Sequence, residues 1–220
     1  MGRSGKSEWL DLISDLRYGA DNKAYQAVYT WLKERLEPFD SLGLQTGRVI
    51  ALGLCAGAIG IHLASVNPGL LVTSIEPHSI LAQRIKGEIE RVHLQQNVEC
   101  LAALLESIPF GDGSFDAVVG CNVLSLGIKP SGILSEIRRI AKPGSALLLC
   151  EPIFGLSRWG RFRQIYNVPA IIRPALKAAN ESAKPETDLK YLLHRARIYD
   201  AKVITSLSNI AILRGYRRRA

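Results

Sequence analysis

Short apolar runs alternate with amphipathic stretches through the middle of the chain. From residue 48 onward, runs of four to seven apolar residues are separated by segments whose apolar positions repeat at helical spacing. The runs are Val49–Leu52, Leu70–Ile75, Val98–Ala102, Phe115–Cys121 and Ala146–Cys150. Helices are predicted between them over 58–65, 79–92 and 131–141. Apolar strands separated by helices are typical of a parallel sheet covered on both faces, so the pattern predicts a doubly wound, Rossmann-like α/β fold.

Different patterns flank this core. Residues 7–37 read as two amphipathic helices, and two short apolar runs over 201–207 and 209–213 read as a closing hairpin of strands. Between core and hairpin lies an aromatic segment that is rich in arginine and interrupted by prolines. We therefore expect one domain in four parts: an N-terminal helical cap, a Rossmann-like core, a basic helical lid and a strand hairpin. Their bounds are 1–45, 46–152, 153–198 and 199–220.

Composition supports a single globular domain. The chain has 220 residues, of which 47% are hydrophobic, and no apolar run reaches the roughly 18 to 20 residues that cross a bilayer. The start of the sequence lacks the apolar centre of a signal peptide, which predicts a soluble, cytoplasmic protein. The four cysteines have neither C-x-x-C spacing nor a nearby histidine, so no metal site or disulfide framework is expected.

Charge is unevenly distributed along the chain. Residues 1–151 carry 14 Lys/Arg and 16 Asp/Glu, whereas residues 152–220 carry 14 and 4, so the formal charge of +8 comes entirely from the last third. A basic face of this kind suits an acidic substrate, an anionic membrane surface or nucleic acid, and equally a solvated face. Trp159 and Phe162, which alternate with arginines, could enter a membrane surface. Nucleic acid is disfavoured because the basic residues are dispersed and no RNA-binding module accompanies them.

The first predicted strand leads into a glycine turn and a helix in the sequence VIALGLCAGAIG, residues 49–60. In an open parallel sheet, ligands bind beyond the carboxyl ends of the strands beside the first strand, where the turn from Gly53 to Gly57 is expected. The following helix would direct its free N–H groups at an anionic ligand group. Glu76 ends the second strand, 23 residues after Gly53, and a carboxylate there can accept hydrogen bonds from both hydroxyls of a ribose.

Residues 106–152 contain further motifs in a fixed order: IPFGDGSFDAVV, CNVL and IRRIAKPGSALLLCEP. Together with VIALGLCAGAIG and VTSIEP, they make roughly residues 45–152 resemble the small-molecule class I S-adenosylmethionine-dependent methyltransferases. This group includes the ubiquinone and menaquinone biosynthesis C-methyltransferases. The resemblance implies S-adenosylmethionine as the cofactor and a seven-stranded sheet whose last strand is antiparallel. It also implies a small-molecule methyl acceptor, which the basic segment 153–198 would bind if the acceptor is acidic or amphiphilic.

The resemblance assigns cofactor contacts to particular positions. Gly53 and Gly57 match the turn glycines, Glu76 matches the acid that binds the ribose, and Cys121 with Asn122 match the stretch that lines the methionine moiety. The full set of expected cofactor-binding residues is Tyr18, Gly53, Leu54, Cys55, Gly57, Glu76, Pro77, Leu104, Leu105, Glu106, Cys121 and Asn122. Four positions depart from the family pattern, namely Ala51, Cys55, Leu104 and Leu126, where an acid, a glycine, an aspartate and a histidine are common.

Methyl transfer is an in-line displacement that depends mainly on alignment, so a general base is needed only if the acceptor must lose a proton. The candidates for that base are His78, Glu151 and His194. Cys55, Cys121 and Cys150 fall at or near strand ends, where their sulfurs could meet a soft acceptor, although cysteine is also common as a small buried residue.

Two other functional classes stay open. The departures from the family pattern allow a related protein with weak or no catalysis that serves as a binding or regulatory subunit. A nicotinamide oxidoreductase is the third reading, which the poor match of Gly53-x-Cys55-x-x-Ala58 to the dinucleotide fingerprint disfavours.

Overall fold

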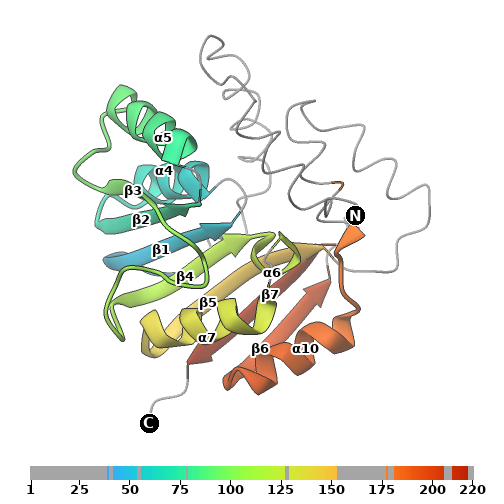
Figure 1. The fold of residues 1–220 in the computed structure, drawn as a ribbon. Coiled ribbons are helices and arrows are strands. Elements are labelled where there is room, and N and C mark those ends of the chain that lie inside the picture. The colour runs from blue at the N-terminus through green and yellow to red at the C-terminus, as the bar shows by residue number, and fades with distance from the viewer. Residues whose placement is uncertain are drawn as a thin grey trace, which may run out of the picture.

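A seven-stranded sheet forms the centre of the protein (Figure 1). The computed structural model describes Phe39 and residues 42–53, 56–77, 79–126, 129–152, 177, 181–205 and 210–217. The strand order is β3-β2-β1-β4-β5-β7-β6. The strands are β1 (Gly47–Gly53), β2 (Leu70–Glu76), β3 (Val98–Ala102), β4 (Phe115–Cys121), β5 (Ala141–Pro152), β6 (Ile198–Thr205) and β7 (Ile210–Arg217).

Strands β1 to β5 are mutually parallel, which confirms the predicted Rossmann-like α/β core. Strand β7 pairs antiparallel with both β5 and β6, so β6 runs in the same direction as the parallel strands. Two predicted strands, 98–102 and 115–121, have the predicted bounds, and β5 begins five residues before the predicted run at Ala146.

Helices connect the parallel strands. They are α4 (Ala56–Val66), α5 (Ser79–Arg91), α6 (Val123–Leu126), α7 (Pro130–Ile140) and α10 (Glu186–Arg195). Helix α4 begins two residues earlier than predicted and includes Gly57, which the sequence analysis placed in the preceding turn. Helix α7 has Pro130 in its first turn, where the missing N–H of proline costs no intrahelical hydrogen bond.

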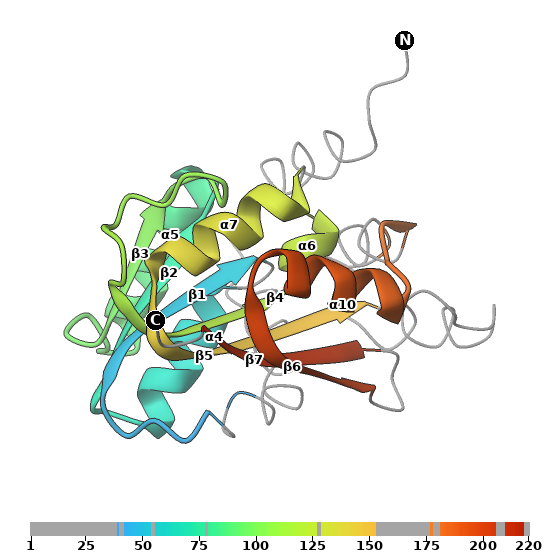
Figure 2. The same ribbon diagram turned by 90° about the horizontal axis from the view of Figure 1, so that it is seen from below.

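The sheet separates two apolar cores. One lies between α4, α5 and the sheet, and includes Val49, Ala51 and Val119. The other lies on the opposite face, where α7 and α10 cover the sheet, and includes Ile50, Phe115 and Ile137 (Figure 2). Because successive residues of a strand point to opposite faces, every second strand residue enters each core, which explains the continuous apolar runs in the sequence.

Helix α10 corrects part of the predicted lid. Leu189 and Leu193 of α10 are each 1% exposed and belong to the core on the α7 face, so this helix covers the sheet and does not lie over the strand ends. The rest of the predicted lid, residues 153–176 and 178–180, lies outside the described residues, as do residues 1–38 of the predicted cap.

The position of α10 also corrects the prediction for His194. Helix α10 leads into β6, whose first residue, Ile198, pairs with Arg217 of β7. The neighbouring residue of β7, Tyr216, pairs with Ala146 in the first half of β5. His194 therefore lies toward the amino-terminal edge of the parallel strands, away from the edge where a cofactor binds in this fold.

No helix in the described parts of the chain is both long and apolar enough to cross a membrane.

Candidate functional site

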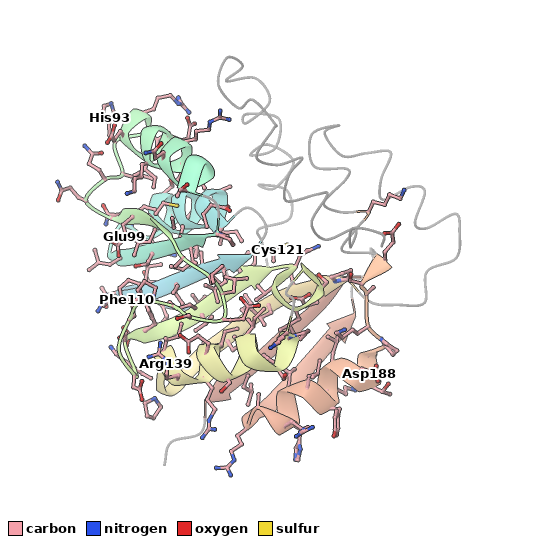
Figure 3. All side chains as sticks on the ribbon, in the orientation of Figure 1. His93, Glu99, Phe110, Cys121, Arg139 and Asp188 are labelled. Carbon is pink, nitrogen blue, oxygen red and sulfur yellow. The ribbon has the colours of Figure 1, made fainter. Side chains whose placement is uncertain are left out.

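The connections of the sheet change direction between β1 and β4. From β1 the chain passes to β2 and β3 on one side, and then returns to β4 and β5 on the other. At this point Gly53 and Cys121, the last residues of β1 and β4, are register partners. Figure 3 shows Cys121 at the edge toward which the β1 and β4 arrows point. Such a switch point is where open α/β sheets bind their ligands.

Any substitution of Gly53 would require the backbone to change its conformation. Its φ is +81°, a left-handed conformation that L side chains rarely adopt. A Cβ atom here would also lie 2.4 Å from the Cys121 carbonyl oxygen and 2.9 Å from Cγ2 of Val123. The end of β1 therefore turns directly against the backbone of β4, as the sequence analysis expected of a turn glycine.

Helix α4 is held close to the sheet just beyond this turn. The Ser74 hydroxyl of β2, fully buried, donates a hydrogen bond of 3.0 Å to the Ala56 carbonyl at the start of α4. Within α4, a Cβ on Gly57 would meet the Ile85 side chain of α5 at 2.6 Å, and a Cβ on Gly60 would meet Ser74 Oγ at 2.5 Å. Because Gly57 has no side chain, α4 can pack closely against α5 at this point. Sequence reasoning missed the Ser74 contact, because a hydroxyl residue within an apolar run does not identify its partner.

Glu76 and Pro77 lie at the same edge as Gly53. Ala51 of β1 is the register partner of Ser74 in β2, so Gly53 and Glu76 each lie two residues farther along neighbouring parallel strands. Glu76 is partly buried, and its carbonyl oxygen accepts the N–H of Ala103 at 3.2 Å. Ala51, where the family pattern favours an acid, is fully buried among apolar side chains. The only acid that ends β1 or β2 is thus Glu76.

The three expected cofactor residues after β3 have different environments. Leu104 is 63% exposed, and its carbonyl oxygen accepts the N–H of Ser107 in a tight turn. Leu105 is buried in the α7-side core, whereas Glu106 is exposed and lies beside Gly132 of α7. Leu104 therefore offers an exposed apolar surface, and Leu105 mainly fixes the loop to the core.

Arg139 of α7 fastens the connection between β3 and β4. Its guanidinium donates to the carbonyl oxygens of Ile108 and Phe110 at 3.0 and 2.7 Å, and to the carboxylates of Asp112 and Glu136. Glu136 also accepts the N–H of Ile108 at 2.7 Å, and the Arg139 partner holds the pKa of Glu136 below its usual value. Two ion pairs of one arginine thus help to hold this loop in place.

Replacing Arg139 with lysine is expected to destabilise the protein by about 1–2 kcal/mol, since an ammonium cannot reproduce the planar fork of donors to two carbonyls and two carboxylates. Urea unfolding measures this loss. The neighbouring substitution Arg138→Lys is the control, because none of these contacts involves Arg138. Equal midpoints for the two variants would contradict the assigned role of Arg139.

Asn122 follows β4 in a strained conformation. Its φ is +56°, its side chain is 6% exposed, and its N–H donates to the Cys150 carbonyl oxygen at 2.8 Å. The Cys121 thiol donates to the Asn122 side-chain oxygen at 3.2 Å. Asparagine tolerates left-handed backbone better than most residues, which explains its suitability at this sharp turn.

Cys121 and Cys150 are register partners on adjacent strands. Burial and, to a smaller extent, the nearby Glu151 carboxyl together raise the pKa of the Cys150 thiol to about 12. Cys150 is therefore a protonated, apolar group at neutral pH rather than a nucleophile or soft ligand. The predicted approach of Cys55 to these two residues falls outside the described part of the chain.

Glu151 is buried at the end of β5, with 1% of its surface exposed. Its two carboxylate oxygens accept the N–H groups of Leu124 and Ser125 at 2.8 and 3.0 Å, at the start of α6. Burial raises the pKa of Glu151 to about 7, and the two N–H donors oppose that rise. The group that the sequence analysis considered as a base is thus engaged with backbone donors.

Four expected site residues, Tyr18, Leu54, Cys55 and His78, lie outside the described residues, as does the side chain of Leu126. Among the residues that the structure does describe, no three His, Cys, Asp or Glu side chains are grouped to hold a metal ion.

Comparisons with known proteins show which family the core resembles. Residues 50–149 match the family model described as a methyltransferase domain. The human thiol S-methyltransferase TMT1B is 31% identical over 109 residues, which are 49% of this chain and 44% of that protein. The demethylmenaquinone methyltransferase of Renibacterium salmoninarum is 30% identical over 107 residues, which are 47% of this chain and 42% of that protein. The chain therefore spans less than half the length of these two relatives.

The fold is shared with solved structures. A SAM dependent methyltransferase from Aquifex aeolicus superposes with a TM-score of 0.68 at 18% identity, covering 98% of this chain and 100% of that one. The resemblance drawn from the sequence motifs is thus confirmed for the core. Residues 50–149 match the methyltransferase domain family, and the sheet that carries them has the fold of S-adenosylmethionine-dependent methyltransferases.

Proposed function

We propose that this protein is an S-adenosylmethionine-dependent methyltransferase that acts on a small acidic or amphiphilic molecule. The observation that carries the proposal is the edge at the switch point of the sheet. There Gly53, which has a left-handed backbone conformation, ends β1 beside the end of β4, and Glu76 ends the neighbouring strand β2. A glycine and a carboxylate at the ends of adjacent strands fit the binding of an adenosine, whose ribose hydroxyls the carboxylate would accept.

The residues present suit the proposed cofactor. Gly53 would present its backbone to the cofactor at the end of β1. Glu76, followed directly by Pro77, would accept the ribose hydroxyls, and the exposed Leu104 would pack against the adenine. Cys121 and Asn122 would line the methionine end beside Gly53. Leu54, Cys55, Gly57, Leu105, Glu106 and Tyr18 complete the proposed set.

S-adenosylmethionine supplies a methyl group on a sulfonium, which is already activated for in-line displacement. The contribution required of the chain is then to bind and align the acceptor, worth up to about 7–11 kcal/mol. This explains why the described residues need no nucleophile–base pair. If the acceptor must lose a proton, His78 remains the proposed base, since Glu151 is engaged with backbone N–H groups and His194 is at the far edge.

The proposed acceptor class rests on the charge of the last third of the chain. Residues 152–220 contain 14 basic residues and only 4 acidic ones. Segment 153–185 is the proposed lid, and contact with an anionic membrane through it is part of the same proposal. The two relatives are named for a thiol and for demethylmenaquinone, which supports a small acceptor without fixing its identity.

Replacing Glu76 with glutamine is expected to weaken S-adenosylhomocysteine binding ten- to hundredfold, because a charged acceptor of ribose hydrogen bonds is lost. Isothermal titration calorimetry with S-adenosylhomocysteine measures the change. The matched control is Glu90→Gln, which removes an exposed carboxylate of α5.

Calorimetry of the wild-type protein separates the other functional classes. Binding of S-adenosylhomocysteine together with methyl transfer from labelled S-adenosylmethionine supports the proposal. Binding without transfer to any member of a panel of thiols, quinols and carboxylic acids points to a binding subunit. Preference for NADH would overturn the proposal in favour of an oxidoreductase.

A further inference from the structure

Glu151, near the end of β5, is hydrogen-bonded to the backbone segment that follows β4. Resting on the proposed function, we infer that Glu151 is a positioning residue for the cofactor. Its carboxylate holds residues 122–125 against the ends of β1 and β4 and thereby keeps the Gly53 turn in its binding conformation. It acts through Val123 and without contact to the cofactor.

The segment 122–125 is fastened to β5 by three hydrogen bonds to two consecutive residues. Asn122 N–H donates to the Cys150 carbonyl oxygen at 2.8 Å. The N–H groups of Leu124 and Ser125 then donate to Oε1 and Oε2 of Glu151 at 2.8 and 3.0 Å. Two of the three bonds thus depend on one buried side chain.

These bonds maintain a backbone that is unfavourable by itself. Asn122 has a φ of +56°, and a non-glycine residue in this region persists where the surroundings determine its conformation. The short helix α6, with only four residues, gives little support of its own. The two hydrogen bonds to the Glu151 side chain therefore constrain the direction in which the chain leaves β4.

Val123 carries that constraint to the turn after β1. Its Cγ2 atom occupies the space where a Cβ on Gly53 or on Gly120 would lie, at 2.9 and 2.4 Å from those positions. Val123 is fully buried. A change in the path of 122–125 would withdraw this methyl group from Gly53, so the turn would lose the packing that fixes its conformation.

Only a carboxyl group places an oxygen opposite each of the two donors. Glutamine offers one acceptor oxygen and places an NH₂ group against the second N–H, which leaves that donor unpaired. Aspartate keeps both acceptor oxygens on a shorter side chain, which makes it the conservative variant. The two substitutions therefore separate the acceptor function from the size of the side chain.

The test is calorimetric binding of S-adenosylhomocysteine to wild-type, Glu151→Gln and Glu151→Asp proteins, at a temperature where far-UV circular dichroism shows each to be folded. We expect Glu151→Gln to weaken binding at least tenfold and Glu151→Asp to restore part of that loss. The control is Asp116→Asn, which removes a carboxylate that accepts the Arg48 N–H at the opposite edge of the same sheet. It should lower the unfolding temperature without changing affinity.

Unchanged affinity in Glu151→Gln, or equal loss in Asp116→Asn, would overturn the inference. If Glu151→Gln does not fold, Val123→Ala decides, because it removes the contact with Gly53 while Glu151 stays in place. Affinity equal to wild type in Val123→Ala would then refute the proposed route. Failure of the wild-type protein to bind S-adenosylhomocysteine would instead refute the proposed function, so the two failures are distinguishable.

Discussion

Replacing Gly53 with alanine is expected to destabilise the protein by about 3 kcal/mol or more and to abolish S-adenosylhomocysteine binding. Two unfavourable effects add at this position. A left-handed backbone costs an L residue about 1–3 kcal/mol, and forcing extra volume into packed structure typically costs about 1–3 kcal/mol more. The 2.4 Å approach to the Cys121 carbonyl oxygen involves backbone, which cannot move aside as a flexible side chain can. Urea unfolding and calorimetry measure the two results.

Gly87→Ala is the matched control for this substitution. Gly87 lies inside α5, and a Cβ there meets no atom within 4 Å. Alanine should therefore stabilise the protein by about 0.5–1 kcal/mol through its higher helix propensity and leave binding unchanged. If Gly53→Ala unfolds at the same urea concentration as the wild type, the close approach of β1 to β4 is not a constraint on the fold.

The stability that depends on Glu151 is expected to fall as pH rises from about 4.5 to 7. Burial raises the pKa of this carboxyl to about 7, above its unfolded value of 4.5, so the folded state binds the proton more tightly than the unfolded state. The favourable contribution is thus complete below pH 4.5 and is lost as pH rises through 7. At about 1.4 kcal/mol for each pKa unit, the change is on the order of 3 kcal/mol.

The comparison of wild-type and Glu151→Gln proteins isolates this effect. Urea unfolding at intervals between pH 4 and 8 should show the wild type losing stability relative to the variant as pH rises. Asp116 and Glu136 provide an internal contrast, since the pKa of each is lowered and their contributions are lost only toward acid pH. A difference between the two proteins that does not vary with pH would contradict the assigned protonation of Glu151.

The parallel core could be predicted because its signals are local. Strands β3 and β4 are mainly apolar runs, and their ends were predicted at 98–102 and 115–121 as observed. Gly53 and Glu76 were also predicted at one edge of the sheet, because all carboxyl ends of parallel strands lie on the same side. The positions of Gly53 and Glu76 could therefore be predicted from the order of the strands and from the rule that ligands bind at their carboxyl ends.

The roles of Ser74, Glu151 and His194 could not be predicted, because they depend on contacts between distant parts of the chain. Glu151 bonds with residues 26 and 27 positions earlier, and Ser74 with a carbonyl 18 positions earlier. The location of His194 depends on β6 running in the same direction as β1 to β5, which places the end of α10 at the amino-terminal edge of the sheet. No pattern of residue types in the sequence encodes these pairings.

Helix α4 has a consequence for the dynamics of the site. Nine of its eleven residues are buried, and it contains two glycines, each costing an isolated helix about 1 kcal/mol relative to alanine. Such a helix has little stability away from the sheet and the α5 surface that enclose it. Its amide hydrogens should exchange with solvent only when that whole side of the molecule opens, so α4 and the strand β2 to which it is bonded behave as one cooperative unit. The start of α4, which borders the proposed adenosine site, is thereby as long-lived as the sheet itself.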